Sequence, residues 1–129
     1  MSTRGAQVLF LFLCSVLIAS RPGSAKEKIT FTPTEAGRHV AKPESCDIQV
    51  FKDSKPEQTY VDVGIINYHD ERHRAKDGTL KLEVVMPKIK ASACKVGGDA
   101  LIDIRVTEVR RLEFAMFNVR ATIVRFAPN

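Results

Sequence analysis

The stretch ACKVGGDALIDI, residues 93–104, decides the fold because two glycines in it separate helix-like from strand-like apolar spacing. Gly97 and Gly98 follow the last helix-like position, where a glycine in the left-handed conformation caps a helix C-terminus. Asp99 is a residue type that organises turns. A phosphate-binding loop has the opposite order, with its glycines between a strand and a helix N-terminus. We therefore expect Gly97, Gly98 and Asp99 to form a structural turn between a helix and a strand.

The segments on both sides of this turn carry the two periodicities. Apolar residues before it recur at helical spacing, at Met86, Ile89, Ala93 and Val96. Pro87 is tolerated in a first helical turn, so the helix is expected to begin near residues 86–87. Residues 80–85 alternate and predict a short extra strand or an irregular first turn. Residues 101–106 alternate as a strand, with one face formed by Ile102, Ile104 and Val106 and the other by Asp103 and Arg105.

Three further strands are expected, at residues 47–51, 60–68 and 113–126. Gly64 lies inside the second of them and suggests a bulge or a close approach by another element. The resulting order, β-β-α-β-β, predicts an α+β fold: a small mixed four-stranded sheet with one crossover helix packed on one face. The strands before and after the helix would be parallel, and the last two strands would form a hairpin through residues 110–112.

Residues 1–25 have the features of a secretory signal peptide. Arg4 gives a positive start, residues 8–19 are apolar or small, and the small residues before and at Ala25 favour cleavage after it. This apolar run is short for a membrane span, and an uncut signal-anchor is the alternative. Cys14 would be the modified residue of a lipoprotein, although the residue before it is a leucine rather than a small residue.

The rest of the chain divides into two parts. Residues 26–45 are polar and contain two prolines and a glycine, so we expect a polar tether. Residues 46–129 would form one small α/β domain.

The chain has 20 Lys and Arg residues against 15 Asp and Glu residues, for a net charge of +5. The basic residues are spread along the sequence, which favours contact with an anionic surface over nucleic-acid binding. We expect an exported protein of the periplasm or outer cell envelope that binds no nucleic acid. It would meet a membrane only through an uncleaved signal or a lipid anchor, and the sequence leaves its oligomeric state open.

Cys46 and Cys94 remain after cleavage of the signal peptide. An even pair in an oxidising compartment predicts one disulfide, with two separate buried thiols as the alternative. Cys94 as a nucleophile would need an adjacent base and an electropositive pocket, which the sequence does not indicate. No Ser/His/Asp order or glycine-rich cofactor loop stands out, so we expect neither enzyme activity nor a cofactor.

His69 and His73, in the stretch HDERH, form the one cluster with the composition of a metal-ligand set. On a helix, two histidines four residues apart would share a face, as they do in zinc proteases. The stretch instead follows a strand, so we expect it to belong to a charged loop at residues 69–78. The two interpretations that remain are a solvated loop and a weak metal site at His69 and His73.

Alternation in the last strand puts Asn118, Arg120 and Thr122 on the face of the sheet opposite the helix. We expect these three residues, together with the loop at residues 69–78, to contact a protein partner. Arg125 falls on the other face, so the basic patch would be incomplete. Scattered charge that serves only solubility is the alternative.

Three stretches together, VDVGII at residues 61–66, ACKVGGDALI at 93–102 and ATIVRF at 121–126, resemble two known families. One is the α/β domain of the Rcs envelope-stress sensor lipoproteins, and the other is the small YbjQ-type domains, which are labelled heavy-metal-binding. The resemblance covers residues 46–126 and speaks to fold more than to function. It implies a non-catalytic exported domain that contacts another envelope protein, with stress sensing as its task. A metal-binding module that uses His69 and His73 is the alternative.

Overall fold

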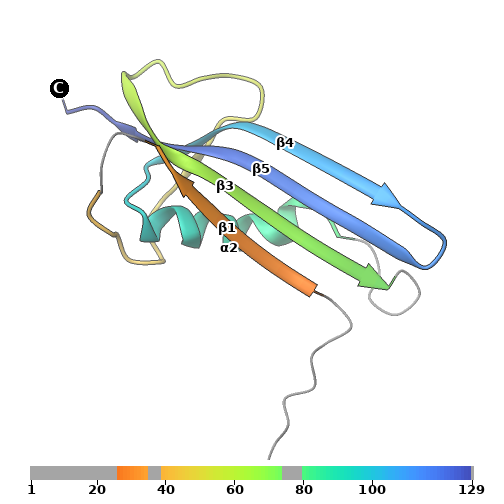
Figure 1. The fold of residues 1–129 in the computed structure, drawn as a ribbon. Helices are drawn as coiled ribbons and strands as arrows, with labels where there is room; N and C mark the ends of the chain where they lie inside the picture. The colour runs from red at the N-terminus through yellow and green to blue at the C-terminus, as the bar shows by residue number, and fades with distance from the viewer. Residues whose placement is uncertain (1–25, 35–38, 74–79, 129) are drawn as a thin grey trace, which may run out of the picture.

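The computed structural model describes residues 26–34, 39–73 and 80–128, so the signal peptide expected at residues 1–25 lies outside them. The elements are β1 Lys26–Pro33, β2 Gln49–Val50, β3 Tyr60–His73, α2 Leu82–Lys95, β4 Ala100–Arg110 and β5 Phe114–Phe126. The strands form one five-stranded sheet in the order β1-β3-β5-β4-β2. Figure 1 shows α2 lying across one face of this sheet. The other side of the sheet is called the helix-free face below.

The predicted α+β class is confirmed, but the expected number of four strands is wrong. β3 and β4 run in the same direction because each is antiparallel to β5, which lies between them. The connection through α2 is therefore a crossover, as expected, although it passes over an intervening strand. β2 pairs parallel with the start of β4 at the far edge.

The fifth strand is β1, which belongs to the segment expected as a polar tether, residues 26–45. It pairs antiparallel with β3 along its whole length. Ile29 and Phe31 pack against the core, and Thr30 between them points to the other face. An edge strand needs only one apolar face and tolerates a proline at its end. The polar composition of β1 therefore led to the prediction of a tether instead of a strand.

β3 continues to His73, so the first part of the charged loop expected at residues 69–78 is strand, and the remainder lies outside the described residues. Extended pairing with both neighbouring strands satisfies the backbone of this charged stretch. The bulge and the close approach expected at Gly64 are both confirmed. The register against β5 shifts between Asp62 and Gly64, and a Cβ at Gly64 would clash with the ring of Phe31.

α2 begins at Leu82, with Lys81 as its N-cap, which is earlier than the expected start; residues 82–85 form its first turn, and the extra strand expected at residues 80–85 is absent. Pro87 therefore lies inside the helix, where it removes the N–H that would bond to the Glu83 carbonyl. Both residues are exposed, which leaves that carbonyl open to water. Burial of one apolar stripe against the sheet holds the helix in place; the buried residues are Val85, Ile89, Ala93 and Cys94.

β4 contains a β-bulge that the alternation did not predict. Its register against β5 shifts between Ile102 and Arg105. Asp103 in the bulge has a φ of 50°, a conformation in which Asp is enriched among non-glycine residues. Two residues of β4 here oppose one of β5, so the alternation reverses beyond the bulge. The predicted common face is therefore wrong, because Ile102 packs on the helix-free face and Ile104 packs against the core beneath α2.

The end of α2 is the structural turn expected at Gly97, Gly98 and Asp99. Gly97 has a left-handed φ of 80°, and its N–H donates to the Cys94 carbonyl at 3.0 Å. The Gly98 N–H donates to the Ala93 carbonyl at 2.9 Å, which completes a Schellman cap. A Cβ at Gly98 would clash with Ile123 of β5. One glycine is thus required for its backbone conformation and the other for its contact with the sheet.

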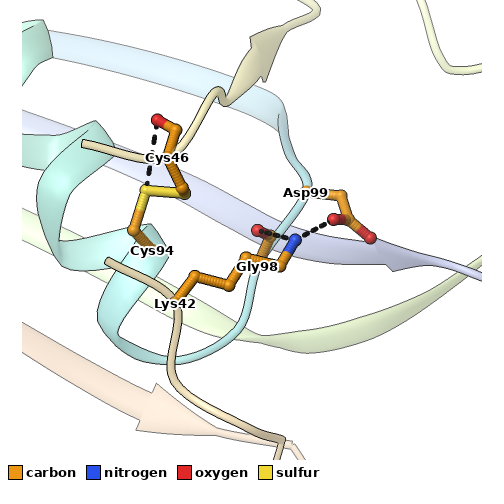
Figure 2. The surroundings of a disulfide bond; sticks show 5 residues. All are labelled: Lys42, Cys46, Cys94, Gly98 and Asp99. Atoms are coloured by element: carbon orange, nitrogen blue, oxygen red, sulfur yellow. Dashed lines mark hydrogen bonds and ion pairs between the residues drawn. A yellow bond between two sulfur atoms is a disulfide. The ribbon is translucent and has the colours of Figure 1, made fainter. Parts of the chain in front are cut away.

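Asp99 fastens this turn to the segments around it. Its N–H donates to the Val124 carbonyl at 2.8 Å, and its carbonyl accepts from the Gln49 N–H at 3.1 Å. Its carboxylate accepts from the Phe126 N–H at 2.8 Å and pairs with the Lys42 ammonium (Figure 2). Burial by itself would raise the pKa of Asp99, but Lys42 and the Phe126 N–H outweigh burial and hold that pKa below its usual value.

Cys46 and Cys94 form the predicted disulfide, with 5.9 Å between their Cα atoms. Figure 2 places Cys94 on the last turn of α2 and Cys46 on the segment that leads to β2. The Lys42 N–H also donates to the Cys94 carbonyl at 2.8 Å, so this segment is attached to the end of the helix twice. A disulfide is typical of oxidising, exported compartments. Within the described ranges, no helix is long and apolar enough to cross a membrane.

Asp99→Asn tests the charge at the turn. The free energy of unfolding at neutral pH should fall by about 1–2 kcal/mol, because the ion pair with Lys42 is lost. Because the folded-state pKa of Asp99 is lowered, its contribution is present above the unfolded-state pKa of about 3.9 and is lost as the pH falls through the folded-state value. The difference in unfolding free energy between the wild type and Asp99→Asn, measured by urea unfolding, should therefore be smaller at about pH 3 than at neutral pH. An equal difference at both pH values would contradict this assignment, and the exposed Asp47→Asn is the charge-matched control.

The double variant Cys46→Ala/Cys94→Ala tests the disulfide. Its free energy of unfolding should be lower by about 2–4 kcal/mol, because the unfolded chain gains the freedom that the cross-link removes. Urea unfolding without reductant measures the loss. The wild type treated with a thiol reductant should then unfold at the same urea concentration as the double variant. A wild-type midpoint that reductant leaves in place would count against the bond.

Candidate functional site

The helix-free face carries the three residues that the sequence suggested for partner contact. Asn118, Arg120 and Thr122 of β5 alternate with the buried residues that pack beneath α2. Asn118 and Thr122 are half-buried and Arg120 is exposed. The structure thus places the three side chains on the face where alternation predicted them, next to both neighbouring strands.

Arg105 joins this group because of the bulge in β4. It lies directly opposite Arg120 in the register between β4 and β5. If β4 held the same residues without a bulge, strict alternation counted from Ile102 would place Arg105 on the helix side. Asp103, Arg105, Arg120 and Thr122 line a polar cavity of about 290 Å³.

The two arginines are cations whose side chains have no direct protein partner. Across the described part of the chain, neither the Arg105 nor the Arg120 side chain makes a hydrogen bond or an ion pair. Like charges directly opposite each other in a sheet are destabilising. Asp103 at the edge of the cavity offsets one of the two charges, so the cavity keeps an excess of one positive charge. Chemically, such a site suits a carboxylate, which a guanidinium can bind through two parallel hydrogen bonds.

His69 lies on the same face, where its Nδ1 hydrogen-bonds to the Oδ1 of Asn118 across the strands. Because the amide oxygen only accepts, the Nδ1 of His69 carries the proton. The structure places His73 in the same strand, four residues further on. Four residues of extended strand separate two Cα atoms by about 13 Å, unlike the spacing of a helical pair. Among the described residues, no group of three His, Cys, Asp or Glu side chains could hold a metal ion, so the metal site at His69 and His73 stays a prediction.

A second polar cluster lies on the other face, between β1, β3 and α2. Asp70 is 1% exposed, and its carboxylate accepts from the Tyr68 hydroxyl and from the Arg72 Nε, each at 3.1 Å. The Tyr68 hydroxyl also lies 2.9 Å from Glu27, and Glu27 pairs with Lys88 of α2 at 2.5 Å. The hydroxyl has one proton, so it donates to one of the two carboxylates at a time.

These contacts shift two pKa values in opposite directions. Burial raises the pKa of Tyr68, and the neighbouring carboxylates raise it further. The hydrogen bond from Lys88 lowers the pKa of Glu27 and outweighs the effect of burial. The cluster therefore ties the edge strand β1 to the helix. Glu27 is engaged by Lys88 and Tyr68, and Asp70 accepts both of its hydrogen bonds at Oδ2, while its buried Oδ1 has no partner among the described residues. Because its contacts join β1, β3 and α2, we treat the cluster as structural.

Two residues of the candidate site were not predicted from the sequence. Alternation predicts Asp103 and Arg105 on one face of a regular strand, but it predicts neither the bulge at Asp103 nor the cavity that both line with Arg120. An aspartate between two β-branched residues is a weak sign of a left-handed position. The buried position of Asp70 was missed as well, because the charged stretch around it predicts a loop.

Comparisons with known proteins add little to this geometry. No protein-family model matches the chain, and no curated protein matches it. Among solved structures, the chain is similar to the one titled "Crystal structure of a Francisella virulence factor FvfA in the orthorhombic form". The identity is 11%, the match covers 74% of this chain and 97% of that chain, and the TM-score is 0.49. A likeness this distant brings neither a family nor a function, and the resemblance to the Rcs sensor and YbjQ-type domains stays a prediction.

Arg105→Gln and Arg120→Gln test the repulsion between the two facing cations. Each single variant should raise the free energy of unfolding by up to about 1 kcal/mol. The double variant should gain less than the sum of the two, because the repulsion is already gone after one substitution. Urea unfolding at low and high salt measures the effect, and salt should reduce it. Arg110→Gln is the control, since Arg110 pairs with Glu108 and should show no gain; a loss of stability in both single variants would refute the repulsion.

Proposed function

We propose that this protein is a non-catalytic exported binding domain whose helix-free face contacts an acidic surface of another protein of the cell envelope. The observation that carries the proposal is the facing pair of Arg105 and Arg120. Neither guanidinium has an ion-pair partner in the part of the chain that the structure describes. A cationic pair kept without a counter-ion at a cost in stability is suited to an anionic partner.

The shape of the site favours a side-chain carboxylate of a protein. The cavity beside the two arginines is polar and small, and it lies on the open face of a sheet. Thr122 at its wall and Asn118 one row away can hydrogen-bond to a partner's backbone or side chains. The excess of a single positive charge matches one aspartate or glutamate carboxylate on the partner.

Two further features support the proposed place of action. The disulfide between Cys46 and Cys94 supports an oxidising compartment, and the signal-peptide pattern of residues 1–25 supports export. The task in stress sensing rests on the family resemblance alone. We therefore place the domain in the periplasm or the outer cell envelope, in contact with a protein there.

Arg120→Glu tests the proposal. The wild-type domain, immobilised as bait, should retain a defined protein from a detergent extract of the envelope, and the variant should retain at least about tenfold less, equivalent to about 1.4 kcal/mol. Retention by the wild type should also weaken as salt is raised. The melting temperature of the variant should not be lower, because the new carboxylate faces Arg105.

Lys55→Glu is the matched control, since it makes the same charge change at an exposed residue in the loop between β2 and β3. It should retain the partner as well as the wild type does. If Arg120→Glu and Lys55→Glu both retain the partner at the wild-type level, the helix-free face is not the binding surface. If both lose it equally, net charge rather than this site explains the binding.

A further inference from the structure

A second cavity, of about 430 Å³, lies at the C-terminal ends of α2 and β5. It is lined by four polar residues, His39, Lys42, Asp99 and Arg125, and by apolar residues that include Val61 and Phe126. Arg125 and the helix-free arginines lie on opposite faces of the sheet, because Arg120 and Arg125 are five positions apart on one strand. This cavity is therefore separate from the proposed protein-binding face, and nothing in the proposed function uses it.

The contact between Arg125 and His39 fixes the protonation of the imidazole. The Nη1 of Arg125 lies 3.1 Å from the Nδ1 of His39. A guanidinium only donates hydrogen bonds, so the Nδ1 must be the acceptor and the proton of the neutral ring is on Nε2. That Nε2 is buried and has no hydrogen-bond partner among the described residues. A buried donor without an acceptor is rare in native proteins and calls for a missing partner.

The charges of the cavity sum to one positive charge in excess. The Lys42 ammonium pairs with the Asp99 carboxylate, so these two charges offset each other. Arg125 makes no ion pair in the described ranges, and its contact with the neutral His39 leaves the remaining N–H groups of the guanidinium unengaged. His39 thus acts as a positioning residue that orients the guanidinium in the wall of the cavity.

We propose that this cavity binds a small organic monocarboxylate that carries an apolar group. The carboxylate would accept hydrogen bonds from the N–H groups of Arg125 that His39 does not engage. The apolar group would lie against Val61, which faces Arg125 across the strands, and against Ala127 and Pro128 at the cavity wall. A cavity of this volume with apolar walls and a few polar groups is typical of small-molecule sites, and one bound monoanion balances the excess charge.

Isothermal titration calorimetry of the oxidised protein with hexanoate tests the proposal. Hexanoate should bind with saturable one-to-one stoichiometry at concentrations up to about 10 mM. Hexanamide, which has the same apolar group without the charge, should not bind. Inorganic phosphate should not compete with hexanoate, because it has no apolar part. Failure of hexanoate to bind, or equal binding of hexanamide or phosphate, would overturn the proposal.

Two variants locate the site. Arg125→Gln should weaken hexanoate binding at least about tenfold. Val61→Asp should do the same, because Val61 faces Arg125 in the register between β3 and β5 and a carboxylate there would occupy the guanidinium. Val61 is 43% exposed, so this variant should fold, and its melting temperature checks that it does. Lys55→Gln, which removes one positive charge at an exposed residue of the loop between β2 and β3, is the control and should bind hexanoate as the wild type does. Undiminished binding in Arg125→Gln, or an equal loss in Lys55→Gln, would refute the site; neither result bears on partner binding through Arg120.

Discussion

The turn from Gly97 to Asp99 is the constraint on which the rest of the structure depends. It ends α2, reverses the chain, and leads directly into β4, an inner strand of the sheet. Gly97 supplies the left-handed backbone, Gly98 lets the turn touch β5, and Asp99 bonds to neighbours on several sides. Because the disulfide attaches to the last turn of the same helix, the end of α2 is held both by its own backbone cap and by a covalent bond to a distant segment.

The turn from Gly97 to Asp99 also affects which residues each face of the sheet presents. The helix covers one face and buries its apolar residues, so polar residues of β5 are left on the other. The two facing cations, Arg105 and Arg120, lie on this helix-free face. At the turn itself, the chain before β2 passes over the end of α2 and forms one wall of the second cavity. The two candidate sites therefore arise from one arrangement and lie on opposite faces.

The sequence predicted those features that depend on a single residue type or on strict periodicity. The cap at Gly97 and Gly98, the bulge at Gly64, the disulfide and the face of Arg120 belong to this group. Features that depend on tertiary pairing were missed. β1 and the end of β3 are polar, and they are strands because each pairs with the other along an edge. The early start of α2 was missed because burial of its apolar stripe outweighs the cost of Pro87.

The bulge at Asp103 has a consequence for how this hairpin can change in length. Asp103 and Ile104 together oppose one residue of β5, so deletion of Asp103 would restore a regular ladder and leave Arg105 facing Arg120. Deletion of a single residue elsewhere in β4 would instead turn every later side chain to the opposite face. A deletion scan of β4 should therefore find one permissive position. The hairpin can lose a residue there and keep Arg105 opposite Arg120, and the cavity would then lose the carboxylate that offsets one of the two charges.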